Sequence, residues 1–478
     1  MIIRSPAAMS RRTVLETAGL GGMAALASPL NRAHAATPAG AIRLAPAPAT
    51  TALLGTGRLR TRVWAYNGSV PGPVLRLRQG HLFQSVVRNG LAEATTVHWH
   101  GIRLPNAMDG VPGLTQKAIP PGGQFLYAFT PPDAGTFWYH PHADSARQIG
   151  HGLSGALIVE EPHPPAIDQD LLWVLQDWSL EGNGQLLPGF DSFMQAAMAG
   201  RLGGLVTING RVPTPVAVQA GARVRLRLIN ACLARIMALR FTGHRPRVIA
   251  LDGQPVAHPF EPAGGRLLLG PAQRAEVILD ANGEPGQRYA VIDDFYGPKL
   301  TYRLAEIAYA PTRATGGHAA DAPLVLPANP VPAPDLDNPI AHTLTIVGGM
   351  MGGTGGAMGG MMGGMGSGQR HIWGIESGGR MDHRMAPAFT IPRGRTCLIT
   401  LRNHTAWWHP MHLHGFSFHV LSRNGIPEPH PHCRDTVLLA PRDTVQFAFV
   451  ADNLGLWMFH CHVIEHQENG LMMVIRVA

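Results

Sequence analysis

The sequence of 478 residues is too long for a single hydrophobic core and long enough for three domains of ordinary size. Hydrophobic residues make up 45% of it, and 57 glycines and 41 prolines interrupt short apolar runs, which favours strands and turns over long helices. The net charge is +8, but the arginines are scattered, so we expect them to lie on a solvated surface and we exclude a nucleic-acid partner. Four cysteines in so long a chain exclude a disulfide scaffold.

The first 35 residues resemble a twin-arginine export signal. Arg11 and Arg12 precede a short, glycine-rich apolar segment that ends in small residues at Ala33-His34-Ala35. The apolar run is shorter than the roughly 20 residues that a bilayer-spanning helix needs. We therefore expect a periplasmic or secreted protein, without a membrane span once residues 1–35 are removed.

Three stretches of the remaining chain share one pattern of alternating strands and turns. We predict domains over residues 36–162, 163–312 and 341–478, with a linker rich in proline and alanine over 313–340. The segments "PGPVLRLRQGHLFQSVVRNG", "QAGARVRLRLINA" and "IPRGRTCLITLRNH" suggest one strand–turn–strand unit used three times. The predicted chain is therefore mostly β structure.

A segment of glycine and methionine, residues 348–368, interrupts the third domain. Its methionines are Met350, Met351, Met358, Met361, Met362 and Met365. A backbone so rich in glycine does not hold regular structure, so we expect a loop. Two interpretations stay open, a low-complexity insertion without chemical use and a set of soft thioether ligands that selects Cu(I).

Four short segments carry histidines at strand spacing: "HWHG", "WYHPH", "HPMHLHG" and "HCHVIEH". They contain His98 and His100; His140 and His142; His409, His412 and His414; and His460, His462 and His466. Residues two apart in a strand point to the same face, so each pair can present two imidazoles to one point. A single such pair is often a packed or surface pair. Four pairs in one chain predict a metal site, and imidazole suits copper, zinc, iron or nickel.

Cys461 stands between two of these histidines and, in a strand, faces away from both. Its thiolate can bind one metal while His460 and His462 bind others across the strand. His409 and His466 can complete a set of two histidines and one cysteine, which is associated with electron-transferring blue copper.

With these motifs the chain resembles the three-domain multicopper oxidases of the bacterial laccase and copper-efflux oxidase type. "YNGSVPGPVLRLRQG", "HWHGIRLPNAMDGVPGLTQ" and "FTPPDAGTFWYHPH" match that family's first domain, and "INGRVPTPVAVQAGARVRLRLINA" and "LGPAQRAEVILD" match its second. The resemblance implies an all-β chain of three cupredoxin-like Greek-key domains, each a β-barrel or sandwich. Since ligands come from the first and last segments, the first and third domains must meet, with the second as a spacer.

The resemblance also implies four copper ions. It assigns the type 1 copper to His409, Cys461 and His466, the type 2 copper to His98 and His412, one type 3 copper to His100, His140 and His462, and the other to His142, His414 and His460. A monomer would then take single electrons from a phenol, an aromatic amine or Cu(I) and reduce O2 to water. The alternative is a cuprous oxidase for copper resistance that uses the methionine loop and has little phenol activity.

Two acids are predicted to serve the protons of this reaction. Asp109 matches the family's acid beside the cluster, and Glu468 lies just past His466, although Gln467 occupies one of the offsets that relatives use. Each acid has a plainer interpretation, as a turn or surface residue.

At Leu471 many relatives carry an axial methionine, and Met472 and Met473 are out of register. Leucine cannot bind the metal, so we expect a three-coordinate type 1 site with a raised potential. A second departure lies in "NHTAWWHPMH", which lacks the carboxylate that efflux-type relatives place beside the type 1 histidine.

The remaining histidines and cysteines carry weaker signals. His430, His432 and Cys433 could bind an extra metal, but the prolines between them favour a surface loop. A pairing of Cys397 with Cys433 stays open, and Cys232 is expected to be a small buried apolar residue.

Three competing functions fit less well. A copper-storing resistance protein needs the methionines but no complete cluster, and a metal-free cupredoxin-fold binding protein needs no ligand set. Copper nitrite reductases are shorter and lack the paired histidines.

Overall fold

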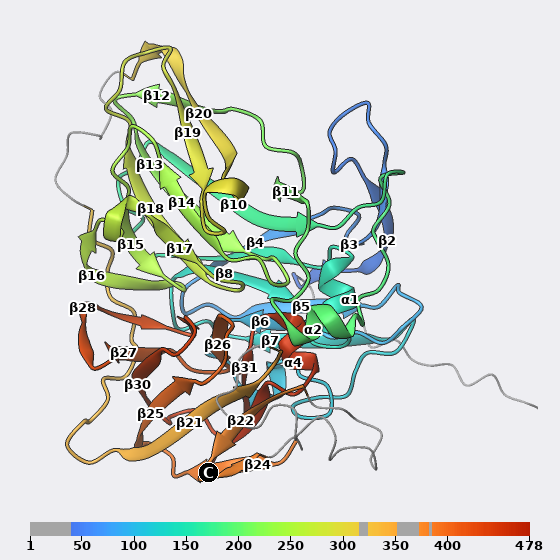
Figure 1. The fold of residues 1–478 in the computed structure, drawn as a ribbon, viewed down its shortest axis with the longest axis vertical. Coiled ribbons are helices and arrows are strands. Elements are labelled where there is room, and N and C mark those ends of the chain that lie inside the picture. The colour runs from blue at the N-terminus through green and yellow to red at the C-terminus, as the bar shows by residue number, and fades with distance from the viewer. Residues whose placement is uncertain (1–39, 315–323, 351–371, 382–384) are drawn as a thin grey trace, which may run out of the picture. The chain divides into compact units, whose positions relative to one another are not determined.

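Short strands are the main regular structure of the described part of the chain, and many of their connections contain glycine or proline (Figure 1). The computed structural model describes residues 40–314, 324–350, 372–381 and 385–478. The predicted all-β fold is confirmed, since the helices among these residues are few and at most six residues long. The predicted export signal lies outside the described residues. No helix among the described residues has the length and hydropathy that crossing a membrane requires.

The first domain packs three small sheets around one core. Their strand orders are β1-β5-β7, β2-β3 and β4-β9-β8-β6. The core contains Trp99, Phe137 and Tyr139, all wholly buried, and each such side chain contributes about 1.5–3 kcal/mol. The elements are β1 Ile42–Leu44, β2 Pro46–Thr51, β3 Thr61–Tyr66, β4 Gly72–Arg78, β5 Phe83–Arg88, β6 His98–His100, η1 Asn106–Met108, β7 Gln124–Phe129, β8 Gly135–His140, α1 Ser145–Gly150 and β9 Gly155–Glu160.

The second domain is a sandwich of two sheets, ordered β11-β10-β13-β18-β15-β16 and β12-β20-β19-β14-β17. Its core is mostly leucine and valine from the facing sides of the two sheets. The elements are β10 Gln169–Trp178, α2 Phe193–Ala197, β11 Leu205–Ile208, β12 Val216–Ala220, β13 Arg223–Asn230, β14 Met237–Phe241, β15 Arg247–Leu251, β16 Gln254–Phe260, η2 Ala263–Gly265, β17 Leu267–Leu269, β18 Arg274–Asp280, β19 Arg288–Asp293, η3 Pro298–Leu300 and β20 Tyr302–Arg313.

The third domain repeats the sandwich, with sheets ordered β23-β22-β21-β25-β30-β27-β28 and β24-β32-β31-β26-β29. Its core includes Cys461 and Leu471, both wholly buried. The elements are β21 Ile340–Gly348, β22 Trp373–Ser377, β23 Arg380–Met381, β24 Pro387–Ile391, β25 Thr396–Asn403, β26 His409–Leu413, β27 Phe418–Arg423, β28 Ile426–Arg434, β29 Thr436–Leu439, β30 Thr444–Val450, β31 Gly455–Cys461, α4 Ile464–Glu468 and β32 Met472–Val477.

Arginines on β13 and β18 are buried between domains, so the expectation of a solvated surface is wrong for them. Arg225 and Arg227 are at most 3% exposed and pair with the buried Glu276. Thr136 of the first domain donates to the same carboxylate at 2.7 Å. The alternation in "RVRLRLIN" has the predicted strand period, but its polar face packs against another domain instead of water.

The first and third domains meet, as the ligand pattern requires. The amide of Asn106 donates to the carbonyl of Leu456 at 2.7 Å, and that of Asn453 donates to Leu104 at 2.8 Å. In Figure 1 the red helix α4 lies beside α1 and α2, and α4 contacts both helices.

Candidate metal centre

Strand pairing brings the histidine pairs opposite one another. β6 pairs with β8 so that His98 faces His140, and β26 pairs with β31 so that His412 faces His460. Both pairings are antiparallel, and all four side chains are buried. Two antiparallel strand pairs, one from each end of the chain, therefore meet at one buried place.

Eight histidines form this cluster. They are His98, His100, His140, His142, His412, His414, His460 and His462, each at most 6% exposed. The closest nitrogens are Nε2 of His414 and Nε2 of His460, 2.9 Å apart. Nε2 of His140 lies 3.4 Å both from Nδ1 of His100 and from Nε2 of His462. The groups that approach within metal-binding distance include His142, His414 and His460.

The cluster presents free nitrogen lone pairs to its own interior. Nδ1–H of His98 donates to the Asp109 carbonyl at 2.8 Å, and Nδ1–H of His412 donates to the Asp435 carbonyl at 2.9 Å. Their Nε2 atoms, like Nε2 of His142, are buried without a hydrogen-bond partner among the described residues. A buried polar atom without a partner costs about 1–3 kcal/mol. A bound metal ion would remove that cost.

Burial keeps seven of these imidazoles neutral. It lowers the pKa of these seven below the usual range, and neighbouring histidines lower it further: His100, His140, His142, His412, His414, His460 and His462. Neutral imidazole is the form that binds metal. The imidazole donors, their burial and their unpaired nitrogen atoms together fit a copper site.

A second set of ligands lies on the other face of β31. Sγ of Cys461 is 3.5 Å from Nδ1 of His409 and 3.7 Å from Nδ1 of His466, and these two nitrogens are 3.2 Å apart. Nε2–H of His466 donates to the carbonyl of Met198 at 2.7 Å. Nε2 of His409 lies 2.8 Å from the Thr405 hydroxyl. Both rings therefore turn Nδ1 toward the sulfur.

Thr405 stands where the sequence lacks the expected carboxylate. Its hydroxyl donates to Oδ1 of Asn403 at 2.8 Å, so it accepts from Nε2–H of His409. A neutral hydroxyl thus orients this histidine.

The strand register puts Leu471 on the Cys461 side. β31 and β32 pair His460 with Met472 and Phe459 with Met473, and Cys461 N–H donates to the Leu471 carbonyl at 3.0 Å. Paired residues share a face, so Met472 lies on the side of His460. Leu471 is wholly buried in the third-domain core that also contains Cys461.

Asp109 touches the cluster, where the sequence places it. Its carboxylate accepts Nδ1–H of His414 at 2.9 Å and lies 3.3 Å from Nδ1 of His98. It is 1% exposed. One side chain thus contacts a histidine from each end of the chain.

Asp435 was missed by the sequence reasoning. Its carboxylate accepts Nε2–H of His100 at 3.1 Å and lies 3.3 Å from Nδ1 of His412. Burial would raise its pKa, but the paired guanidinium of Arg274 holds that pKa below the usual range. The sequence carries no local signal for it, because the pairing of the next residue, Thr436, with His412 is visible only in the structure.

Glu468 and Glu465 differ in their surroundings. Glu468 is exposed, and its carboxylate accepts the Ala146 N–H at the start of α1 at 2.9 Å. Glu465, which the sequence reasoning missed, is 2% exposed, and neither carboxylate oxygen has a hydrogen-bond partner among the described residues. Burial raises the pKa of Glu465 to about 7.

The histidines near Cys433 have other partners. His430 stacks on Phe260 with ring centroids 4.0 Å apart, and Nε2 of His432 accepts from Arg434 at 2.9 Å. The segment belongs to β28, so the expected surface loop is a strand. Cys232, Cys397 and Cys433 are free thiols, and Cys232 is buried as expected.

Met350 is the one loop methionine among the described residues, and its two backbone partners, Ala197 and Trp407, are neighbours of residues that bond His466 and His409. Met350 N–H donates to the Ala197 carbonyl at 2.8 Å, and its own carbonyl accepts from Nε1 of Trp407 at 2.8 Å. Where the described chain resumes, Trp373 packs on His466 with ring centroids 4.2 Å apart. Met351, Met358, Met361, Met362 and Met365 lie outside the described residues.

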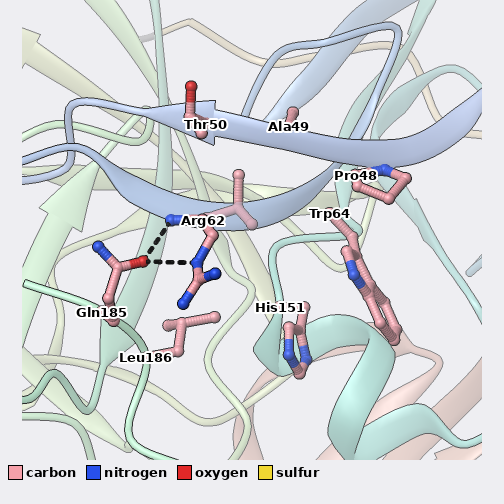
Figure 2. Close-up of a pocket in the computed structure, with 9 residues that line it drawn as sticks. Pro48, Ala49, Thr50, Arg62, Trp64, His151, Gln185 and Leu186 are labelled. Carbon is pink, nitrogen blue, oxygen red and sulfur yellow. Dashed lines mark hydrogen bonds between the residues drawn. The ribbon is translucent and has the colours of Figure 1, made fainter.

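A surface cavity of about 660 Å³ lies apart from the predicted ligands. Figure 2 shows Trp64 beside His151, with ring centroids 4.3 Å apart, and Arg62 bonded to Gln185. The lining residues are Pro48, Ala49, Thr50, Arg62, Val63, Trp64, His151, Gln185 and Leu186. None of them belongs to the two ligand sets.

Comparisons with known proteins agree with this geometry. Multicopper oxidase family models match residues 49–164, 170–309 and 361–478. The crystal structure of a multicopper oxidase from Pseudomonas thermotolerans is 36% identical, with a TM-score of 0.79 over 91% of this chain and 98% of that one. Laccase-2 of Fomitopsis schrenkii is 30% identical over 86% of this chain and 85% of its own.

A third relative is the multicopper oxidase from Campylobacter jejuni, a metallo-oxidase. It is 26% identical, with a TM-score of 0.74 over 91% of this chain and 90% of that one. These relatives are oxidoreductases of the cupredoxin-like, copper-binding type that the sequence resembles. The chain belongs to the multicopper oxidase family.

Proposed function

We propose that this oxidase takes single electrons from a small reductant at the His409–Cys461–His466 set and passes them to O2 at the eight-histidine cluster. The observation that carries the proposal is the placement of Cys461 on one face of β31 and His460 on the other. One tripeptide thereby joins two buried ligand sets.

The proposed stoichiometry is four copper ions. Type 1 copper belongs to the Cys461 set, type 2 copper to His98 and His412, and the two type 3 coppers to the remaining six histidines. Bound copper supplies one-electron redox chemistry at the first set and storage of electrons for O2 reduction at the second. The unpaired nitrogens of the cluster and the close approach of His142, His414 and His460 support copper at this place.

The protein itself supplies the connection between the sets. The path runs from Sγ of Cys461 through its backbone to the neighbouring histidines. Nδ1–H of His460 also donates to the Cys461 carbonyl at 2.8 Å, which adds a hydrogen-bonded link to the covalent one. The path is short because Cys461 adjoins both histidines in the chain, and it excludes water because all three residues are buried.

Asp109 is the proposed proton-relay acid of the cluster. It already holds Nδ1–H of His414, so it lies within one hydrogen bond of the ligands. Glu468 remains a prediction for the same role, since its nearest partner is the backbone of α1. Its exposure suits a group that takes protons from solvent.

Two classes of reductant are candidates for the electron donor of this oxidase. The resemblance implies phenols, aromatic amines or Cu(I); one relative is named a laccase, and another is named a metallo-oxidase, which fits a metal ion as reductant. The methionines of the segment favour Cu(I), because soft thioethers select it, and the backbone bonds of Met350 tie the start of the segment to Ala197 and Trp407. We propose that the methionine loop serves Cu(I) and that phenols react without it.

We further propose export by the twin-arginine route, action in the periplasm or outside the cell, a monomeric state and a part in copper homeostasis. The arginine pair and the small-residue cleavage pattern support the route. A cofactor protein that folds before export suits that route.

Replacement of the thiol tests the central assignment. The copper-loaded protein should be blue, and Cys461→Ser should remove the blue band while the histidine cluster still binds copper. Cys433→Ser, which changes a free thiol outside both sets, is the matched control and should stay blue. A full visible band in Cys461→Ser would refute the type 1 assignment.

A further inference from the structure

Asp435 lies at the junction of two cluster histidines and is wholly buried. Oδ1 accepts Nε2–H of His100 at 3.1 Å and lies 3.3 Å from Nδ1 of His412. The backbone carbonyl of the same residue accepts Nδ1–H of His412 at 2.9 Å. One residue thus orients two imidazoles that the resemblance assigns to different copper ions.

Arg274 of the second domain holds this carboxylate. Its guanidinium donates from Nη1 to Oδ1 at 2.9 Å and from Nη2 to Oδ2 at 2.5 Å. It also donates to the carbonyls of Asp252 at 2.8 Å and Ala272 at 3.1 Å, and it is wholly buried. A guanidinium fixed by so many acceptors fixes Asp435 in turn.

The contact with Asp435 determines which nitrogen His100 turns to the cluster. A neutral imidazole carries one N–H, and an ionised carboxylate can only accept, so the proton sits on Nε2. Nδ1 of His100 is then the free lone pair, and it lies 3.4 Å from Nε2 of His140. His98, His412 and His460 do the reverse, since their Nδ1–H groups donate to carbonyl oxygens.

We propose that Asp435 is a positioning residue that sets His100 to bind through Nδ1 and holds His412 in place. Arg274 of the second domain in turn holds the Asp435 carboxylate. The inference rests on the proposed function of the cluster. The second domain is then part of the metal site and not only a spacer between the other two.

A purely structural ion pair is the competing explanation, and the chain contains a matched example. Glu276 is also wholly buried and also bound by arginines of the second domain, Arg225 and Arg227, but it contacts no histidine of either ligand set. Replacing it tests the cost of breaking a buried ion pair without touching the cluster.

Asp435→Asn is the informative variant. Its amide has one oxygen, while Arg274 and His100 both present donors, so the amide nitrogen must face one of them. If the nitrogen faces His100, the ring has to turn its proton to Nδ1, which then cannot bind metal. Loss of such outer partners lowers metal affinity about 10–100-fold.

The experiment compares Asp435→Asn with Glu276→Gln after copper loading. Copper per chain, the type 2 electron paramagnetic resonance signal and the near-ultraviolet type 3 band report on the cluster, and the blue Cys461 band is the internal standard. Asp435→Asn should lose cluster copper and change both cluster signals at an undiminished blue band, whereas Glu276→Gln should match the parent. Unchanged cluster signals in Asp435→Asn, or equal losses in both variants, would overturn the inference.

If Asp435→Asn does not fold, a milder variant with its own control tests the same inference. Arg274→Lys keeps the charge but loses the two-pronged contact, and Arg227→Lys is its control on the neighbouring strand. Arg274→Lys should weaken cluster copper binding and Arg227→Lys should not; equal behaviour would overturn the inference. A parent protein that binds no copper would defeat the proposed function itself, which is a separate outcome.

Discussion

Gly101, the last residue of "HWHG", should tolerate no side chain. Its φ is +85°, and a Cβ there would lie 2.3 Å from Nη2 of Arg274 and 2.5 Å from Oδ2 of Asp435. Neither neighbour can move freely, because Arg274 is bound to the carbonyls of Asp252 and Ala272. Gly101→Ala therefore perturbs the clamp that Arg274 and Asp435 form through their two-pronged contact.

The expected cost has two parts. A left-handed backbone costs an L-residue about 1–2 kcal/mol, and overpacking a well-filled core costs about 1–3 kcal/mol. The variant should lose about 2–5 kcal/mol of unfolding free energy, a large share of the roughly 5–15 kcal/mol of a typical protein.

Gly80→Ala is the matched control. Gly80 also has a positive φ, +75°, but a Cβ there would meet nothing within 4 Å. Urea unfolding should therefore show only the backbone cost of about 1–2 kcal/mol. Gly101→Ala should also load less cluster copper, whereas Gly80→Ala should load normally. Equal stability losses and normal copper loading in both would refute the description of the clamp.

Three further predictions follow from the register, the buried charges and the methionine segment. Leu471→Met should lower the type 1 potential in a redox titration, because it adds a weak axial sulfur. Met472→Leu, on the opposite face, should leave the potential unchanged. A rise in the potential of Leu471→Met would place the axial position elsewhere. Burial would raise the pKa of Glu276, but Arg225 and Arg227 lower it to about 2, so this carboxylate stabilises the fold above about pH 4.5 and loses that effect as the pH falls. The stability advantage of the parent over Glu276→Gln in urea unfolding should accordingly shrink by about 2 kcal/mol between about pH 5 and pH 3, and a constant difference would contradict the pairing. Deleting residues 351–366 should leave phenol oxidation and stability largely intact, since stability depends only weakly on loop length. The deletion should slow Cu(I) oxidation. Equal loss of both activities would mean that the segment has a structural role.

Local spacing was enough to predict the two ligand faces. The period of two along a strand places Cys461 opposite to His460, whatever the rest of the fold. The resemblance points to Leu471 as the axial position, and the strand register places Leu471 on the Cys461 side of the sheet. The opposite facing of Cys461 and His460 depends only on residues that are adjacent in the chain, so the sequence alone predicts it.

The clamp could not be predicted because its members are far apart in the chain. Arg274 and Asp435 are separated by 161 residues and belong to different domains. The alternating arginines of β13 have the pattern of a solvated face, and only the packing of β8 against them shows that they are buried. Glu465 stands beside a predicted ligand, yet its burial depends on the second-domain segment near Gly200.

The most direct test of the proposed electron path is the ratio of donor oxidised to O2 consumed. Oxygen uptake measured with a one-electron donor should show four donor molecules oxidised per O2 and no peroxide, because the Cys461 set accepts single electrons and the histidine cluster holds O2 until all four arrive. Cys461→Ser should abolish the uptake. Two donor molecules per O2 with release of peroxide, or undiminished uptake in Cys461→Ser, would contradict the account.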